Sequence, residues 1–321
     1  MTKVILTGFA GFIGSYVLDI LLKKGYFVIG IDNLSEGSDL DNFDKEASNF
    51  IPIYMDIQNP SLHKVLDSLI LDKEDFYIVN CAADSHVDRS WDQVSKFIDS
   101  NIKGPLNLAD WGLKKKSNLI KFVQVSTDEV WGGAPQPFTE DSVHAPENIY
   151  SSTKASAEVL LSNYHKGYGL PLVITNGANT YGPRQMEEKI IPKSIKRIFN
   201  KQKIPLYKTP ARRMWLHARD HADGIVRAME SGVVGERYCL SPDSSQELYT
   251  RDLVYLICDA MKVDPREYVE EVPDRLNYDT RYFMLNDKAI SSLGFEPQHD
   301  IKKELANLVI WYLEKYEDSV H

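Results

Sequence analysis

Three glycines near the N-terminus limit what this chain can fold into. Gly8, Gly11 and Gly14 follow the short apolar run 4–6 and open an amphipathic stretch that reaches residue 24. This order predicts a strand, a tight turn and a helix. A dinucleotide pyrophosphate binds backbone N–H groups at a helix N-terminus, and a Cβ in the turn would block its approach. The G-x-x-G-x-x-G spacing by itself fits a cofactor site and a plain strand-to-helix turn equally well.

A second apolar run decides between these two interpretations. Residues 27–31 end at Asp32, at the distance from the glycines where a dinucleotide fingerprint has a carboxylate for the adenosine ribose hydroxyls. The same carboxylate would repel a 2′-phosphate. The pattern therefore favours NAD over NADP.

Composition excludes several other classes of protein. The 321 residues correspond to roughly two domains. Cys81, Cys239 and Cys258 are odd in number and lack paired spacing, so we expect neither a disulfide framework nor a metal site. A formal net charge of −9 disfavours nucleic acid as a partner. The chain has no apolar run near about 18 residues and no apolar leader, so we expect a cytoplasmic protein without a membrane span.

Short apolar runs alternate with helical patterns over the first half of the chain. Further strands are predicted at 50–54, 77–80, 119–125 and 172–175, and helices at 61–71, 91–116 and 150–167. Such alternation predicts an α/β fold, a doubly wound parallel sheet with helices on both faces.

Prolines break this rhythm beyond about residue 176. We therefore expect an NAD-binding Rossmann domain over 1–176, to which segments around 214–230 return, and a smaller, less regular substrate lobe over 177–321. Ligands of such sheets bind at the carboxyl ends of the strands. The loops expected to face one cleft are 81–90, 126–133 and 176–190.

Tyr150 and Lys154 lie four residues apart at the start of a helical pattern, which places both side chains on one face. Such a pair alone more often marks an exposed amphipathic face. With the cofactor fingerprint upstream, the ammonium and a positive nicotinamide ring would lower the pKa of the phenol from near 10 toward neutrality. Tyr150 is then expected to be a general base.

Asp128 and Glu129 are adjacent, and adjacent acids are more often two solvated loop residues. On a regular strand their side chains would point to opposite faces. Both reach one substrate only if the chain leaves the strand by Thr127 and turns, and Gly132 and Gly133 supply such a turn. Two neighbouring carboxyls resist double ionisation, so one would remain an acid while the other acts as a base.

Together these motifs resemble the extended short-chain dehydrogenase/reductase superfamily, through residues 7–14 and the Y-S-S-T-K segment at 150–154. Within it, S-T-D-E-V-W-G at 126–132 is similar to the S-T-D-E-V-Y-G segment of dTDP-glucose 4,6-dehydratases. Epimerases and decarboxylases of the superfamily usually do not have both of these carboxylates. The resemblance runs from residue 3 to about 316, with further matches at 82–90, 181–183, 188–192 and 274–275.

The resemblance implies a lyase that dehydrates a nucleoside-diphosphate hexose, foremost dTDP-glucose to dTDP-4-keto-6-deoxyglucose. Tyr150, beside Lys154, would take the proton of the sugar's 4-hydroxyl while hydride passes from C4 to NAD, with Thr127 hydrogen-bonding the same oxygen. Glu129 would remove the C5 proton, Asp128 would protonate the departing 6-hydroxyl, and the hydride would return to C6.

The resemblance also implies the binding residues. Those for the nucleotide sugar are His86, Thr127, Asn179, Lys189, Arg213 and Arg275. Those for NAD are Gly8, Gly11, Phe12, Ile13, Gly14, Asp32, Asn33, Asp56, Ile57, Ala82, Ala83, Tyr150 and Lys154. Arginine suits a diphosphate because its planar fork binds phosphate oxygens in pairs. His217 and His221 match no ligand spacing and are expected to be structural.

Departures from the dehydratase pattern gather on the substrate side. Trp131, Thr180, Cys239 and Tyr278 stand where dehydratases commonly have Tyr, Asn, Asn and His, and Asp84 replaces a frequent Glu. The nucleotide and the hexose therefore stay open, UDP-linked sugars included.

Two other functions also stay open. A nucleotide-sugar 4-epimerase or decarboxylase would need the Tyr–Lys pair and NAD but not both carboxylates. A non-catalytic NAD-sensing regulator would be expected to lack the tyrosine or the lysine.

The helical patterns at 91–116 and 150–167 carry apolar residues expected to point outward, for example Val159, Leu160 and Leu161. With the family's habit of pairing these helices, this implies a homodimer with an isologous four-helix contact.

Overall fold

The computed structural model describes residues 2–133 and 135–318. Its main sheet has seven parallel strands in the order β10-β6-β5-β4-β1-β2-β3 within the described residues. They are β1 (Lys3–Thr7), β2 (Phe27–Asp32), β3 (Phe50–Tyr54), β4 (Phe76–Asn80), β5 (Leu119–Thr127), β6 (Leu172–Gly177) and β10 (Arg237–Leu240). The predicted doubly wound parallel sheet is confirmed.

Strand β1 is the centre of this sheet. Its residues pair in register with 27–31 of β2 on one side and with 76–80 of β4 on the other. The strand order reverses here, because the chain crosses from β3 back over β1 to β4. A crevice therefore opens beyond the carboxyl ends of β1 and β4, the usual ligand position in such sheets.

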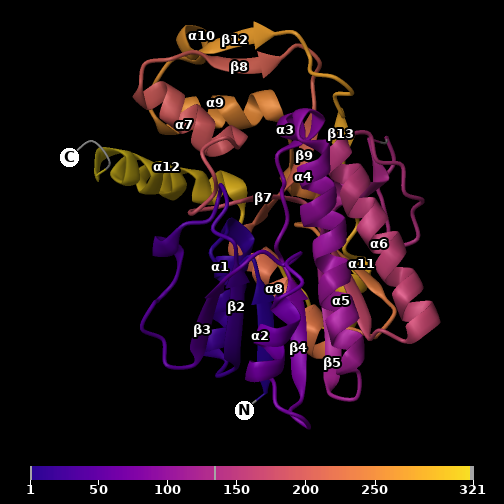
Figure 1. Cartoon of the computed structure of the whole chain (residues 1–321). Helices are drawn as coiled ribbons and strands as arrows, with labels where there is room; N and C mark the ends of the chain where they lie inside the picture. Colours follow the sequence, from indigo (N-terminus) through magenta and orange to yellow (C-terminus); the bar gives the residue numbers. More distant parts are fainter. Residues whose placement is uncertain (1, 134, 319–321) are drawn as a thin grey trace.

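Alternate residues of the strands build two cores. Val4 and Leu6 face the core beneath α1 (Phe12–Lys23) and α8 (Ala218–Ser231), whereas Ile5 faces the core beneath the other helices. Those helices are α2 (Leu62–Leu69), α5 (Gly104–Lys114) and α6 (Ile149–Tyr168). Helices α5 and α6 lie side by side (Figure 1).

The prediction of one continuous helix at 91–116 is wrong. It is divided into α3 (Val87–Asp92), α4 (Val94–Ile98), a π-helical turn (Asp99–Lys103) and α5. Pro105 has no N–H to bond the preceding turn. The buried Asn101 side chain bonds the backbone of Asp84 and the hydroxyl of Thr153 instead. The wider turn accommodates both features.

One residue of the long helix α6 is also placed differently from the prediction. Val159 and Leu160 are 48% and 37% exposed, but Leu161 is fully buried against the sheet. The expectation that Leu161 points outward is wrong, because the rotation of about 100° per residue carries it to the inner face of the helix.

The second lobe lies above the carboxyl ends of the main strands (Figure 1). It has a four-stranded sheet of β7 (Asn179–Tyr181), β9 (Arg212–His217), β11 (Glu247–Tyr249) and β13 (Arg281–Tyr282), and a pair of β8 (Ile204–Tyr207) with β12 (Val269–Val272). Its helices are α7 (Ile190–Phe199), α9 (Thr250–Ala260), α10 (Pro265–Tyr268) and α12 (Ile301–Asp318), and α11 (Asp287–Leu293) packs beside α8.

The chain returns to the first layer after β9. Helix α8 packs against α1, and β10 adds to the sheet beside β6. Short 3₁₀ helices complete the described chain at Leu40–Asn42, Asp128–Trp131 and Ser244–Gln246. Across residues 2–133 and 135–318, the helices fall short of the length and apolarity that a membrane span requires.

Candidate active site

The glycine turn between β1 and α1 has room for nothing larger than hydrogen. Gly8 has a φ of 70°, and a Cβ on it would lie 2.8 Å from the backbone nitrogen of Ala82. A Cβ on Gly14 would lie 1.9 Å from the carbonyl oxygen of Gly8. The start of α1 therefore lies directly against the turn, and its backbone N–H groups are accessible to a ligand.

This turn borders the smaller of two neighbouring cavities, which has a volume of about 200 Å³. All thirteen expected NAD residues line it: Gly8, Gly11, Phe12, Ile13, Gly14, Asp32, Asn33, Asp56, Ile57, Ala82, Ala83, Tyr150 and Lys154. They come from the end of β2, the loops that follow β1, β2, β3 and β4, and the first turns of α1 and α6.

Asp32 ends β2 with its carboxylate buried at the cavity edge. It accepts hydrogen bonds from the Ala10 N–H at 3.0 Å, the Leu34 N–H at 2.9 Å and the Ser38 hydroxyl at 2.7 Å. A carboxylate has about four acceptor positions. These bonds fix its orientation and leave capacity for a further hydroxyl donor.

The N-terminus of α6 holds Tyr150 and Lys154. Asn148 caps the helix by accepting from the Ser151 N–H at 2.8 Å, and the Ser151 hydroxyl accepts from the Asn148 N–H at 3.2 Å. This capping box fixes the first helical turn, where Tyr150 lies. One turn later, the Lys154 ammonium donates to the carbonyl of Val125 at 2.7 Å.

The expected fall in the pKa of Tyr150 includes the effect of a bound nicotinamide ring and stays a prediction. Burial raises the pKa of this phenol well above its ordinary value, and the Glu129 carboxylate raises it further. A hydrogen bond with Thr127 acts in the opposite direction. Lys154 directs its ammonium at a backbone carbonyl, and burial lowers the pKa of Lys154 to about 8.

The chain leaves β5 at Thr127, as predicted for the carboxylate pair. The 3₁₀ helix Asp128–Trp131 begins there, and the Thr127 hydroxyl accepts from the Glu129 N–H at 3.3 Å. Gly132 follows with a φ of 72°, and a Cβ on it would lie 2.3 Å from the Ala145 carbonyl oxygen.

The two carboxyls differ in their surroundings. Burial, followed by the Glu129 charge, raises the pKa of Asp128 to about 7. Burial also raises the pKa of Glu129, whereas the Asn148 amide donates to its Oε2 at 3.1 Å and lowers the pKa. Asp128 therefore keeps its proton up to about neutral pH, as a general acid must.

A second, larger cavity of about 580 Å³ lies beside the first. Five expected substrate residues in addition to Glu129 line it: His86, Asn179, Lys189, Arg213 and Arg275. Lys189 borders both cavities. Thr127 and Asp128 are buried beneath the surface, where the Thr127 hydroxyl donates to Asp128 Oδ1 at 3.1 Å.

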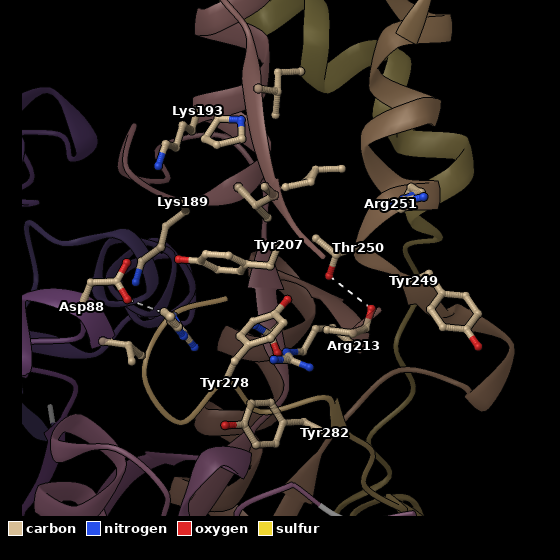
Figure 2. A pocket seen from close by; sticks show the side chains of 18 of the residues that line it. Asp88, Lys189, Lys193, Tyr207, Arg213, Tyr249, Thr250, Arg251, Tyr278 and Tyr282 are labelled. Atoms are coloured by element: carbon tan, nitrogen blue, oxygen red, sulfur yellow. Dashed lines mark hydrogen bonds and ion pairs between the residues drawn. The ribbon is translucent and has the colours of Figure 1, made fainter. Parts of the chain in front are cut away.

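Two arginines are held in this larger cavity. The Arg213 guanidinium lies over the ring of Tyr282, at 4.4 Å, and donates to the carbonyl oxygen of Asp279 at 2.7 Å (Figure 2). Arg275 lies 3.3 Å from the Asp88 carboxylate. These cations suit a phosphate group, in a chain whose net charge is negative.

The remaining expected substrate residues have local partners as well. His86 caps α3 by accepting from the Arg89 N–H at 3.1 Å, and its Nε2 lies 3.3 Å from Glu188. Lys189 donates to the Ser85 carbonyl at 3.0 Å. His86 thus has a structural function in addition to its position at the cavity.

Sequence reasoning noted Tyr278 as a departure on the substrate side but missed the residues that lie with it at one end of the larger cavity. Tyr207 of β8 and Tyr278 have ring centroids 4.6 Å apart there (Figure 2). Lys193, Thr250 and Arg251 line the same end. Local sequence carries no signal for them, because β8 and the segment before β13 are distant in sequence.

The two histidines expected to be structural have protein partners. The His217 ring stacks on His299 with centroids 4.2 Å apart, and His221 lies 2.8 Å from the Thr180 hydroxyl. In the part of the chain that the structure describes, no group of three or more His, Cys, Asp or Glu side chains is arranged to hold a metal ion.

Comparison with known proteins agrees with this arrangement. The sequence model of a family described as GDP-mannose 4,6 dehydratase matches residues 5–308. The dTDP-glucose 4,6-dehydratase of Salmonella typhimurium is 32% identical, over 97% of this chain and 92% of that protein.

Solved structures extend the similarity to the whole fold. DesIV, a dTDP-glucose 4,6-dehydratase from Streptomyces venezuelae solved with NAD bound, superposes with a TM-score of 0.92 at 32% identity, covering 98% of each chain. The UDP-glucuronic acid 4-epimerase from Bacillus cereus, in complex with UDP-glucuronic acid and NAD, gives 0.90 at 25% identity, covering 98% of this chain and 100% of that one.

Proposed function

The chain belongs to the GDP-mannose 4,6-dehydratase family, within the extended short-chain dehydrogenases/reductases, and on this premise we propose that it is a nucleotide-sugar 4,6-dehydratase. The observation that carries the proposal is the pair of buried Asp128 and half-buried Glu129 next to Tyr150. Both carboxyls are needed to remove water, and neither is needed for a simple oxidation.

The glycine turn and Asp32 support NAD as the cofactor. The absence of a Cβ at Gly8 and Gly14 lets the turn pack directly against the start of α1 at the cavity, and the Asp32 carboxylate lies where a 2′-phosphate would be repelled. Bound NAD would accept a hydride from C4 of the sugar and return it to C6. The thirteen residues that line the smaller cavity would hold it.

Tyr150 is the base toward the sugar's 4-hydroxyl in this proposal. Because burial and Glu129 raise the pKa of Tyr150, the phenolate needs the positive charge of Lys154 and the hydrogen bond of Thr127. Thr127 lies at the carboxyl end of β5, and Lys154 lies beside it. Both side chains favour the ionised form of the Tyr150 phenol.

The next step removes the elements of water across C5 and C6. Glu129 faces the larger cavity and would take the C5 proton, which the C4 ketone has made acidic. Asp128, with its pKa raised to about 7, would give its proton to the 6-hydroxyl as that group leaves as water. Glu129 would then return a proton to C5 as the hydride adds to C6, so the net change is the loss of one water.

The larger cavity suits the nucleoside diphosphate. Arg213 and Arg275 would bind the phosphate oxygens together with Asn179 and Lys189, and Tyr207 and Tyr278 offer aromatic surface to the base. The substrate we propose is dTDP-glucose, giving dTDP-4-keto-6-deoxyglucose. Its support is the similarity to dTDP-glucose 4,6-dehydratases.

A 4-epimerase or decarboxylase is the second candidate, because a UDP-glucuronic acid 4-epimerase has nearly the same fold. The two reactions differ in mass. The purified protein should be incubated with dTDP-glucose, UDP-glucose, GDP-mannose and UDP-glucuronic acid, and the products weighed by mass spectrometry. Loss of one water supports dehydration, an unchanged mass supports epimerisation, and loss of carbon dioxide supports decarboxylation.

Two substitutions test the division of work among the site residues. Tyr150→Phe removes the first base, so we expect neither bound NADH nor product. Glu129→Gln leaves the first oxidation possible, so one turnover should stall with NADH and a 4-keto hexose bound, and steady-state turnover should fall at least about 10²-fold.

Tyr164→Phe is the matched control, because it makes the same change on α6 at a hydroxyl that donates to the exposed Asp110 at 3.0 Å. It should leave dehydration unchanged. If Glu129→Gln stopped NADH formation as completely as Tyr150→Phe, the assignment of separate bases would be wrong.

The proposal includes a homodimer in the cytoplasm. Exposed apolar side chains support the dimer on the α4–α6 side, namely Val94, Ile98, Val159, Leu160 and Tyr168. The free thiols of Cys81, Cys239 and Cys258 support a reducing compartment.

A further inference from the structure

A group of polar side chains, two of them buried and two half-buried, lies beneath the turn at 127–131, and the proposed reaction uses none of it. We call it the Glu158 cluster: Glu158, His144, Asn176 and Arg237. Glu158 is fully buried on α6, one turn after Lys154 and two turns after Tyr150. A buried carboxylate is costly unless it is fully paired.

Both carboxylate oxygens of Glu158 have partners. Oε2 lies 2.7 Å from Nη2 of Arg237 and 2.9 Å from Nε2 of His144, and Oε1 accepts from the Asn176 amide at 2.8 Å. Burial acts to raise the pKa of Glu158, but the His144 hydrogen bond and the Arg237 charge outweigh it and hold the pKa below its ordinary value. Glu158 is therefore ionised.

The cluster is connected to the catalytic turn at both ends. The Asn176 amide that bonds Glu158 also donates to the carbonyl of Thr127 at 2.9 Å, the last residue of β5. The Arg237 guanidinium lies 5.8 Å from the ring centroid of Trp131, the last residue of the 3₁₀ helix. The Glu158 cluster thus contacts both the start and the end of the turn.

Side chains of helix α6 are connected by hydrogen bonds to two carbonyls at the end of β5. Lys154 bonds Val125 directly, and Glu158 reaches Thr127 through Asn176. We propose that Glu158 is a positioning residue: through Asn176 it fixes the Thr127 carbonyl, and its negative charge favours the protonated form of Lys154. This inference rests on the proposed function of Tyr150 and Lys154.

The groups that face Lys154 give the sign of the effect. They are Glu158 on α6 itself and the Cys81 thiol after β4, while β5 presents the uncharged Val125 carbonyl. Burial lowers the pKa of Lys154 to about 8, and Glu158 raises it against that effect. Removing the Glu158 charge should therefore lower the pKa of Lys154 further.

The test is the rate of NADH formation in a single turnover, measured across pH on the NAD-loaded enzyme. Glu158→Gln should slow this step by on the order of tenfold to a hundredfold. Its alkaline limb should move to lower pH by roughly one unit, because the ammonium is lost earlier. KM for the nucleotide sugar should not change, since no member of the cluster lines the larger cavity.

Asn176→Ala separates the two parts of the inference. It cuts the connection to Thr127 but removes no charge, so it should slow NADH formation without moving the alkaline limb. Asp220→Asn is the control, because this buried carboxylate accepts from the backbone of Gln298 and His299, away from the turn. It should lower Tm and leave the pH profile unchanged.

Amide hydrogen exchange supplies a readout that needs no reaction. Exchange across 126–131 should be faster in Asn176→Ala and Glu158→Gln than in the wild type, and unchanged in Asp220→Asn. Equal exchange in wild type and Asn176→Ala would overturn the inference, even if Glu158→Gln failed to fold. If wild-type enzyme formed no NADH with any nucleotide hexose, the proposed function would fail, and the exchange experiment would still decide the role of the cluster.

Discussion

Burial governs the proton chemistry of the individual site residues. It is the largest cause of the pKa shift at Asp128, Glu129, Tyr150 and Lys154. In every case it favours the neutral form: the pKa of each acid rises and the pKa of the lysine falls. Neighbouring charges and hydrogen bonds then determine which of these acids gives up its proton first.

The raised pKa of Asp128 predicts how dehydration depends on pH. Because this pKa is about 7, the acid form is lost as pH rises through neutrality, and water loss should slow above about pH 7. Asp128→Asn should lower the rate and remove that dependence. Quenched single turnovers followed by mass spectrometry measure water loss separately from NADH formation, whose alkaline limb belongs to Lys154.

The raised pKa of Asp128 also predicts that ionisation of this residue lowers the stability of the folded protein. The folded protein binds the Asp128 proton more tightly than the unfolded chain does, so ionisation destabilises the wild type progressively from about pH 4 to about pH 7. Asp128→Asn should therefore have the higher Tm at about pH 8, and the two Tm values should converge near pH 4. A constant difference across pH would contradict the raised pKa.

Asp32 carries the prediction on cofactor choice. Asp32→Ala should weaken NAD binding and narrow the preference over NADP, because the carboxylate that would repel a 2′-phosphate is gone. Isothermal titration of the apoprotein with each dinucleotide measures both affinities. Asp41→Ala removes an acid whose side chain is 89% exposed and should change neither affinity.

Elements that carry their own periodicity could be predicted from the sequence. The six strands up to β6 and the helix α6 lie within two residues of their predicted ends. The π-helical turn at 99–103 could not be predicted, because Asn101 stabilises it through partners 17 and 52 residues away. The β8–β12 pair likewise joins distant segments.

The candidate site likewise has a part that could be predicted from the sequence and a part that could not. The glycine turn, the Tyr–Lys pair and the two carboxyls each lie within a few residues of sequence, so their spacing carries the signal. The contact of Tyr207 with Tyr278, and that of Glu158 with Asn176 and Arg237, exist only after the sheet has formed. Spacing cannot reveal such partners.

The start of α1 carries the prediction at the scale of elements. In Gly14→Ala the new Cβ would lie 1.9 Å from the Gly8 carbonyl, so the turn must open; Tm and NAD affinity should both fall. Gly167→Ala is the control, because it is also a helical glycine but has nothing within 4 Å of the added Cβ. It should raise the free energy of unfolding by about 0.5–1 kcal/mol in a denaturant titration.

At the scale of the whole molecule, the two cavities meet between the layers. Gln185 and Lys189 line both of them, so the cofactor and substrate sites share a wall built by the segment between β7 and α7. The carboxyls of the main sheet and the cations of the second lobe thus reach one space. Neither layer alone contains the complete site.

The proposed dimer is tested by charging its surface. Leu160→Glu, with or without Val159→Glu, should convert a dimer into a monomer, because a charge buried in an apolar contact is unfavourable. Ile310→Glu introduces the same change at a side chain that is 54% exposed on α12, on the other side of the molecule (Figure 1), and should leave the dimer intact. Light scattering at micromolar concentration distinguishes these outcomes, and a wild-type monomer would refute the dimer.

The position of β10 at the edge of the main sheet affects the chain while it is being made. A ribosome completes β6 at Gly177, but β10, which covers the edge of β6, begins only at Arg237. Helix α1 likewise stays uncovered until α8 has been made. During that interval the nascent chain displays an unpaired strand edge and an apolar helix face, both of which favour aggregation. Chaperone occupancy on translating ribosomes should therefore peak between these two points and fall once β10 has emerged.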